Sequence, residues 1–325
     1  MNTDFIFDIK NETDFTAAAI KVFNYQYQKN KVYRLFCNLL KTSPEEVTSL
    51  EHIPFLPIQF FKTHAIVSSI APVETVFTSS GTTGSTTSKH MVTAISIYEK
   101  SYRKGFEYFY GNIENYVVLA LLPSYLERTG SSLIYMVDDL IKKSNNPESG
   151  FYLDNLEELK DKLIALDESG QKVLLIGVSF ALLDLVEKHS FQLKNTIVME
   201  TGGMKGKRKE MIRTELHEVL SKGFGVPYIH SEYGMTELLA QGYSKGNGIF
   251  ECSPWMSILT RDTEDALTIL PNGKNGGINV IDLANINSCS FIATQDLGKK
   301  YKDGSFEVIG RFDNSDIRGC NLMVL

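Results

Sequence analysis

The sequence predicts an α/β fold in which a largely parallel sheet is followed by a smaller β-rich subdomain. Between about residues 74 and 243, short apolar runs such as 116–122 and 173–176 alternate with longer segments of helical periodicity. Such alternation is typical of strands that pair in parallel through helical crossovers. After residue 243 the pattern changes, because Gly, Asn and Asp punctuate short β-like runs.

The first part of the chain, residues 1–73, is predicted to be a helical segment packed on the main domain. Apolar residues recur at helical spacing in 15–28 and 32–40. Ser43 followed by Pro44 is typical of a helix start, with Pro at the first helical position. Pro54 and Pro57 exclude a regular helix in residues 53–58.

The core is expected to comprise residues 74–243 and the β-rich subdomain residues 244–325. In the core we expect strands at 74–78, 116–122, 173–176 and 196–200, and helices at 91–110, 131–143, 156–168, 180–189 and 207–221. In the subdomain we expect β-like runs at 248–253, 256–261, 266–270, 277–282, 290–294 and 306–309.

The composition argues against several classes of protein. The formal net charge is −6, from 33 basic and 39 acidic side chains, which argues against a nucleic-acid partner. We expect no signal peptide in residues 1–10 and no membrane span, since no apolar run is long enough. The four cysteines lack the spacing of a metal site, which favours a cytoplasmic protein with reduced thiols.

Residues 78–89 are the most informative segment, because nearly all of them are Ser, Thr or Gly. Such a loop offers hydroxyl and backbone N–H donors with little bulk, and Lys89 at its end adds a positive charge. Following an expected strand, it is predicted to bind phosphate; a flexible linker is the alternative. It is not a Walker A loop, because Gly84 is followed by Ser85 rather than by Lys.

Four short motifs follow one another along the chain. They are Ser80-Gly81-Thr82-Thr83-Gly84, Ser231-Glu232-Tyr233-Gly234-Met235-Thr236-Glu237, Thr294-Gln295-Asp296-Leu297-Gly298 and Gly310-Arg311-Phe312-Asp313. Together they resemble the signatures of the adenylate-forming superfamily, which includes acyl-CoA synthetases and firefly-type luciferases. Segments 53–62 and 123–128 further resemble LuxE-type acyl-protein synthetases.

The resemblance implies the N-terminal-domain fold of adenylate-forming enzymes, a nucleotide-binding core at 74–243 and a hinge near residue 311. It implies a ligase that uses ATP and Mg²⁺ to convert a carboxylic acid, with a fatty acid favoured, into an acyl-adenylate. The acyl group would then pass to a thiol. The expected acceptor is a cysteine of a partner protein, such as an acyl reductase or a carrier protein, or else CoA.

The resemblance also assigns roles to individual residues. Glu237 would bind Mg²⁺, Thr236 would contact the α-phosphate, and Lys89 would add charge, so these three are the expected catalytic residues. Asp296 would accept hydrogen bonds from the ribose hydroxyls, with Arg311 assisting. Outside the motif context, each of these residues has a simpler interpretation, such as a loop ion pair or a helix N-terminal glutamate.

The remaining implied residues surround the adenine and the acyl group. Tyr233 would stack on the adenine, although a buried aromatic residue is an equally good interpretation of it alone. The other expected nucleotide-binding residues are Ser79, Ser80, Gly81, Thr82, Thr83, Gly84, Gly202, Gly203, Met204, Glu232, Gly234 and Met235. The expected acyl pocket comprises Gly177, Val178, Ser179 and His230.

The sequence departs from the family pattern in one respect. Family members continue past the hinge with a domain that carries a catalytic lysine, whereas this chain ends at Leu325. An internal lysine such as Lys89 or Lys205 could replace it, a partner could supply it, or activity could be lost. Cys320 is a candidate acyl acceptor, although a small residue in the hinge is the favoured interpretation.

Three alternatives to the acyl-protein synthetase stay open. The first is an acyl- or aryl-CoA ligase, and the second is a non-catalytic nucleotide-binding partner subunit. The third is a hydrolase, because Gly177-Val178-Ser179-Phe180-Ala181 resembles a nucleophile elbow in which Ser179 would attack. A hydrolase also needs a histidine, for which His217 and His230 are available.

Overall fold

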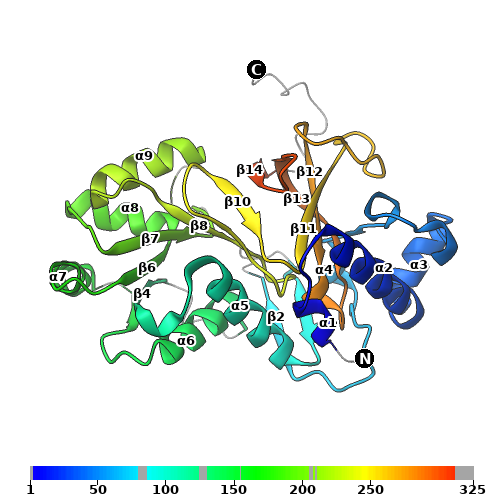
Figure 1. Ribbon diagram of the computed structural model, residues 1–325, viewed down its shortest axis with the longest axis horizontal. Coiled ribbons are helices and arrows are strands. Elements are labelled where there is room, and N and C mark those ends of the chain that lie inside the picture. The colour runs from blue at the N-terminus through cyan, green and yellow to red at the C-terminus, as the bar shows by residue number, and fades with distance from the viewer. Residues whose placement is uncertain are drawn as a thin grey trace.

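The computed structural model describes residues 3–79, 86–123, 130–153, 155–204, 208 and 211–311. Within these residues the strands form one 12-stranded sheet and a separate two-stranded hairpin. The large sheet has a parallel half and an antiparallel half, which meet at the strand pair β8 and β9 (Figure 1). The α/β fold class predicted from the sequence is therefore confirmed.

The parallel half has the strand order β5-β4-β6-β7-β8. Its central strands β4 and β6 are buried along their whole lengths, as expected from their continuous apolar sequences. The strands are β4 (Val117–Leu121), β5 (Gly150–Tyr152), β6 (Val173–Val178), β7 (Thr196–Thr201) and β8 (His230–Tyr233). The helices are α5 (Ile95–Tyr110), α6 (Ser132–Ser144), α7 (Leu156–Glu168), α8 (Ser179–Lys188) and α9 (Arg213–Phe224).

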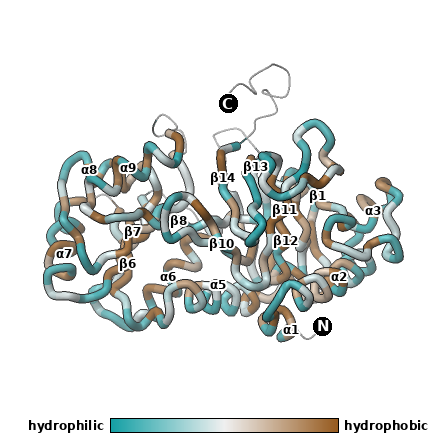
Figure 2. Tube along the Cα trace, turned by 45° about the horizontal axis from the view of Figure 1, so that its top comes forward, coloured by the Kyte–Doolittle hydropathy of each residue, from teal (hydrophilic) through white to brown (hydrophobic). Residues whose placement is uncertain are grey.

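The antiparallel half continues the same sheet in the order β9-β10-β14-β13-β12-β11, with β1 added in parallel to β13. Many residues within these strands are hydrophobic, whereas the outer turns are hydrophilic (Figure 2). The strands are β1 (Leu56–Pro57), β9 (Gly242–Ser244), β10 (Ile249–Cys252), β11 (Met256–Arg261), β12 (Asn275–Asp282), β13 (Phe291–Lys300) and β14 (Phe306–Arg311).

The N-terminal helices pack against the antiparallel half, at the end of the molecule opposite to α7, α8 and α9 (Figure 1). Helix α2 (Glu12–Lys29) starts after Asn11, whose side chain accepts the Asp14 N–H at 2.9 Å. From this helix, Gln26 donates to the carbonyl oxygen of Ile286 at 2.9 Å. Three shorter helices complete this region: α1 (Asp4–Phe7), α3 (Lys31–Leu39) and α4 (Phe60–Thr63).

Three expected elements differ from the structure, and several strands were not expected. Residues 89–92 form β3 (Lys89–Val92), so the helix expected from residue 91 starts at Ile95. The helix expected from residue 207 starts at Arg213, and 266–270 contributes only the isolated bridge of Ile269 to Arg261. Short or polar strands were missed, namely β1, β5, β8 and β9. A single apolar period is hard to read in two to four residues.

The expected division at residue 244 falls within β9, where the large sheet continues without a break, so the three-part division stays a prediction. Across the described part of the chain, the helices are too short or too polar to span a membrane.

Candidate active site

The loop predicted to bind phosphate joins the two strands of the small hairpin. Strand β2 (Thr75–Thr78) pairs antiparallel with β3, and Thr78 lies opposite Lys89. Beyond this pair, the Ser79 N–H donates to the Ser88 carbonyl oxygen at 3.2 Å, and the Ser88 N–H donates to Ser79 Oγ at 2.9 Å. The base of the loop is therefore fixed, and Lys89 is exposed beside it. Ser80, Gly81, Thr82, Thr83 and Gly84, like Lys205 and Cys320, lie outside the described residues.

Glu237 lies next to the end of this loop. It is buried, and burial raises the pKa of its carboxyl above the usual value, whereas a hydrogen bond from Ser88 and the charges of Arg311 and Lys62 lower it. Thr236, directly before it, is half-buried. The motif that begins in β8 and the loop between β2 and β3, far apart in sequence, are thus brought together at this carboxylate.

A second buried carboxylate, Asp296 on β13, lies beside the tyrosine of the same motif. The Tyr233 hydroxyl donates to Asp296 Oδ2 at 2.9 Å, and Arg311 Nε lies 3.4 Å from Asp296 Oδ1. Burial raises the pKa of Asp296, and Arg311 and Tyr233 oppose that rise. Because Arg311 lowers the pKa of both Asp296 and Glu237, the two carboxylates share one electrostatic environment.

Tyr233 is itself buried and packs against Phe250 and Phe306, with ring centroids 6.0 and 5.5 Å away. Both ring pairs are edge-on, which holds the tyrosine in one orientation. The tyrosine predicted to stack on adenine is therefore fixed in position by its hydroxyl and by its aromatic neighbours.

The carboxyl ends of β6, β7 and β8 carry a charged cluster on one face of the sheet. Glu200 on β7 pairs with Arg213 of α9, accepts from Ser179 Oγ at 3.1 Å, and lies 3.5 Å from His217 Nε2. Ser231 Oγ of β8 lies 3.4 Å from the same nitrogen of His217.

This arrangement argues against the hydrolase interpretation. Ser179 is 2% exposed and donates to a carboxylate rather than to a histidine. A serine nucleophile needs one nitrogen of the histidine on the hydroxyl and the other nitrogen on the acid. Here the carboxylate of Glu200 and the hydroxyl of Ser231 both approach Nε2 of His217.

The opposite face carries Glu232, whose carboxyl accepts from Thr201 Oγ1 at 2.6 Å. Burial and the nearby charge of Glu200 raise the pKa of Glu232 to about 7. Gly234 lies against this carboxyl, because a Cβ at Gly234 would come within 2.4 Å of Glu232 Oε1. A side chain at position 234 would therefore displace the glutamate.

The predicted acyl-pocket residues do not form one group. Gly177 and Val178 lie within the packing of β6, where a Cβ at Gly177 would meet Leu182 at 2.7 Å. Ser179 belongs to the Glu200 cluster described above. His230 lies near α5, with Nδ1 3.2 Å from the Tyr110 hydroxyl, and burial and the charge of Lys245 lower its pKa to about 4.

The remaining predicted nucleotide-binding residues lie in two loops at the ends of adjacent strands. Gly202, Gly203 and Met204 follow β7, and Gly234 and Met235 follow β8. Gly202 has a φ of +71°, a backbone conformation that favours glycine. In parallel sheets, ligands bind beyond the carboxyl ends of the strands, which is where both loops lie.

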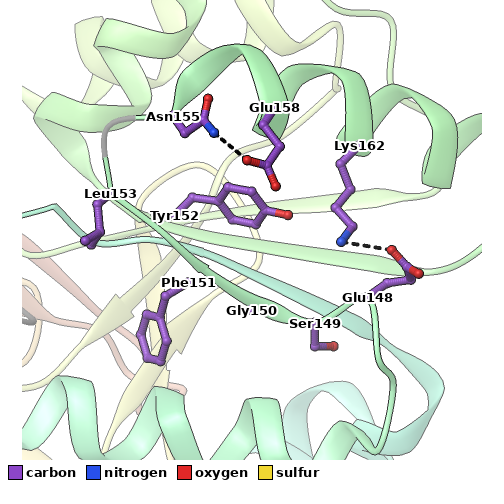
Figure 3. A pocket seen from close by; sticks show the side chains of 9 residues that line it. All are labelled: Glu148, Ser149, Gly150, Phe151, Tyr152, Leu153, Asn155, Glu158 and Lys162. Carbon is purple, nitrogen blue, oxygen red and sulfur yellow. Dashed lines mark hydrogen bonds and ion pairs between the residues drawn. The ribbon is translucent and has the colours of Figure 1, made fainter.

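A cavity of about 440 Å³ lies elsewhere, between β5 and α7 (Figure 3). Tyr152 points into the space between Glu158 and Lys162, and Lys162 forms an ion pair with Glu148 at 2.8 Å. None of the predicted site residues lines this cavity. The site is therefore assigned by the convergence of the motifs rather than by the cavity.

Sequence reasoning missed several residues that hold the site. Ser88 was named only as part of the small-residue loop 78–89, and Arg213 only as part of the helix expected at 207–221. His90 and Asn285 were not singled out, although both are fully buried. A histidine directly after a Ser/Thr-rich loop was the one available signal.

Two solved structures illustrate the similarity of this fold to known proteins. ATP-bound MatB from Rhodopseudomonas palustris superposes with a TM-score of 0.56 over 77% of this chain at 18% identity, and the chain spans 50% of that protein. A 2-hydroxyisobutyryl-CoA ligase in complex with 2-HIB-AMP superposes with a TM-score of 0.69 over 93% of this chain, at 13% identity and over 68% of that protein. The fold is thus that of the adenylate-forming ligases.

Sequence comparison then defines the family. A protein of Vibrio harveyi named long-chain-fatty-acid–luciferin-component ligase is 23% identical over 357 residues, covering 99% of this chain and 90% of the relative. The acyl-protein synthetase family LuxE matches residues 7–325, and the chain belongs to this family of ligases.

Proposed function

We propose that this protein activates a fatty acid with ATP to an acyl-adenylate and transfers the acyl group to a cysteine of a partner protein. The observation that carries the proposal is the convergence of Glu237, Asp296 and Arg311, which come from different motifs. Arg311 acts electrostatically on both carboxylates. Membership of the acyl-protein synthetase family and the name of the Vibrio harveyi relative support the fatty acid and the protein acceptor.

In the first step a carboxylate oxygen of the acid attacks the α-phosphorus of ATP, and pyrophosphate leaves. Catalysis of such a transfer depends on positioning and on the neutralisation of charge. The loop anchored at Ser79 and Ser88 would hold the β- and γ-phosphates. Asp296, held by Tyr233, would accept hydrogen bonds from the ribose hydroxyls, and Thr236 would contact the α-phosphate.

Glu237 is the residue that would hold Mg²⁺. Among the described residues no group of three or more His, Cys, Asp or Glu side chains could form a metal cage. A single carboxylate fits Mg²⁺, which takes most of its ligands from phosphate oxygens and water. When bound, the ion would neutralise negative charge on the leaving pyrophosphate.

In the second step the thiolate of the acceptor attacks the acyl carbonyl carbon, and AMP leaves with the electron pair of the broken C–O bond. Cys37 and Cys289 are buried, and burial raises the pKa of Cys37 to about 12 and keeps the Cys289 thiol protonated as well. These two cysteines are therefore unsuited to take the acyl group. The acceptor in the proposal is a thiol of a second protein.

The test is acid-dependent ATP–pyrophosphate exchange over a panel of short, long and aromatic acids. We expect exchange with long-chain acids, and a loss of about 100-fold or more in Glu237→Gln, because the carboxylate that would hold Mg²⁺ is removed. Glu264→Gln, at an exposed loop glutamate, is the matched control and should retain full activity.

Three other outcomes have distinct meanings. Exchange that continues in Glu237→Gln would contradict the assigned role of this residue. ATP binding without exchange for any acid would favour a non-catalytic nucleotide-binding subunit. Formation of acyl-CoA in the presence of CoA, without labelling of a protein thiol, would replace the protein acceptor by CoA.

A further inference from the structure

Two fully buried polar side chains hold the main chain of the Thr236-Glu237 segment through its carbonyl oxygens. Nδ1 of His90, on β3, lies 2.9 Å from the Thr236 carbonyl oxygen. Nδ2 of Asn285, in the 3₁₀ helix Leu283–Asn285, donates to the Glu237 carbonyl oxygen at 2.7 Å. Two successive carbonyls of the catalytic motif are therefore each held by a side chain from a different element.

The two holding side chains lie next to each other, and neighbouring elements anchor them. His90 Nε2 lies 2.9 Å from Asn285 Oδ1, and the edge of Phe61 packs on the imidazole with ring centroids 5.6 Å apart. Gln26 of α2 donates to the Asn285 carbonyl oxygen at 3.1 Å. His90 also follows directly after Lys89, where the loop between β2 and β3 ends, so it connects this loop to the Thr236-Glu237 segment.

The position of the proton on the His90 ring shows which contacts hold the Thr236-Glu237 segment. A carbonyl oxygen only accepts, so Nδ1 of His90 carries the proton that is donated to Thr236. Burial lowers the pKa of His90 to about 4, so at neutral pH the ring is neutral and Nε2 has no hydrogen for Asn285 Oδ1. The donations from His90 Nδ1 to Thr236 and from Asn285 Nδ2 to Glu237 are therefore the two that matter.

We propose that His90 and Asn285 are positioning residues that hold Thr236 and Glu237 in register with the phosphate-binding loop. Ser88, at the base of the loop, adds a hydrogen bond to the Glu237 carboxyl on the other side of the segment. We call this pair, His90 and Asn285, the clamp. With the clamp in place, ATP held by the loop meets the carboxylate of Glu237 and the hydroxyl of Thr236, whose backbone is already fixed. This inference rests on the proposed adenylation, and it concerns groups behind the site rather than groups that touch ATP.

Two substitutions of His90 separate the clamp from simple packing. In His90→Asn, the amide nitrogen takes the place of Nδ1 and can still donate to Thr236. In His90→Gln, the amide nitrogen takes the place of Nε2, and the donation to Thr236 is lost. We expect kcat for ATP–pyrophosphate exchange to fall by about 10- to 100-fold in His90→Gln, the range measured for groups that orient a ligand of the reacting centre. His90→Asn should recover most of that rate.

Asp167→Ala is the matched control. Asp167 is buried, accepts from the N–H groups of Lys194 and Asn195, and so also fixes a backbone segment, near the amino end of β7. This variant should lower Tm but leave kcat of the folded protein unchanged. In His90→Gln, KM for the acid should stay within about twofold of wild type, because the lost interaction acts in the transition state.

Hydrogen–deuterium exchange of the 234–241 peptide gives a readout that does not depend on activity. We expect faster amide exchange there in His90→Gln, and unchanged exchange in His90→Asn and Asp167→Ala. Equal losses of rate in both His90 variants, in proportion to their losses of Tm, would reduce His90 to a packing residue. Absence of ATP–pyrophosphate exchange in the wild-type protein would contradict the proposed function. The clamp would still be tested by the 234–241 peptide, because unchanged amide exchange in His90→Gln would contradict it.

Discussion

Neighbouring strands β7 and β8 each carry a buried glutamate near the carboxyl end, and the two carboxyls are held in opposite ways. Glu200 lies in register with Ser231, and Thr201 with Glu232, so the two glutamates project from opposite faces of the sheet. Glu200 pairs with Arg213. Glu232 accepts a neutral hydroxyl from Thr201.

The difference shows in the pKa values of the two carboxyls. Burial raises both, but Arg213, together with hydrogen bonds involving His217 and Ser231, brings the pKa of Glu200 below its usual value. For Glu232 burial wins, and its pKa rises to about 7. Burial of a carboxyl therefore fixes its charge only when a cation is buried with it. The face with Tyr233 has a compensated charge, and the face with Gly234 has a carboxyl that is half protonated near neutral pH.

The largest effect is expected from Glu200→Gln, which leaves Arg213 without its carboxylate. Removing one partner of a buried ion pair costs about 3 kcal/mol or more, and we expect that loss in the free energy of unfolding at pH 7. Denaturation in urea measures it. Glu187→Gln, which breaks the surface pair with Arg208, is the control and should cost about 0.5 kcal/mol or less because solvent screens that pair.

A double-mutant cycle sharpens this result. If the pair is coupled, Glu200→Gln combined with Arg213→Met should cost less than the sum of the two single changes. Additive losses would mean that Arg213 does not compensate Glu200, and the contrast between the two faces would then have no electrostatic basis.

The sequence predicted the parallel half well where burial and secondary structure act together. Strands β4 and β6 are buried throughout and read as continuous apolar runs. Strand β8 is also buried over most of its length, but its sequence is His-Ser-Glu-Tyr, because its polar side chains find partners inside the protein. An alternation rule based on hydropathy cannot identify such a strand.

The site shows the same division. The motif around Tyr233 and Glu237 could be identified because its residues, at fixed spacing, resemble a family signature. The pair of Glu200 with Arg213 spans 13 residues, and the contact of His90 with Thr236 spans 146. The first depends on how α9 packs against β7, and the second on how the small hairpin packs against the segment after β8, and neither follows from local sequence.

Glu232→Gln should have the opposite sign to Glu200→Gln above pH 7. The folded pKa of Glu232, about 7, lies above its usual value of 4.5, so its contribution to stability is present below pH 4.5 and is lost as the pH rises through 7. Glutamine stays neutral, so at pH 8 the variant should be more stable than wild type by about 3 kcal/mol, and the two should converge at pH 4. Urea denaturation at both pH values tests this, and a variant that is less stable at pH 8 would show that the carboxylate has a cationic partner.

The smallest effect is expected from Thr201→Val, which keeps the shape of the side chain and removes a neutral donor to Glu232. The hydroxyl favours the charged carboxylate and so lowers the pKa of Glu232, and without it that pKa should rise further. Because a hydrogen bond to a charged group is the stronger kind, the cost should be about 1–2 kcal/mol at pH 8 and less at pH 4. Stability curves against pH should therefore show the Glu232 transition at a higher pH in Thr201→Val. Thr201→Val introduced into the Glu232→Gln variant should produce no such transition. A cost in stability that does not depend on pH, in wild type and in Glu232→Gln alike, would mean that Thr201 acts through packing alone.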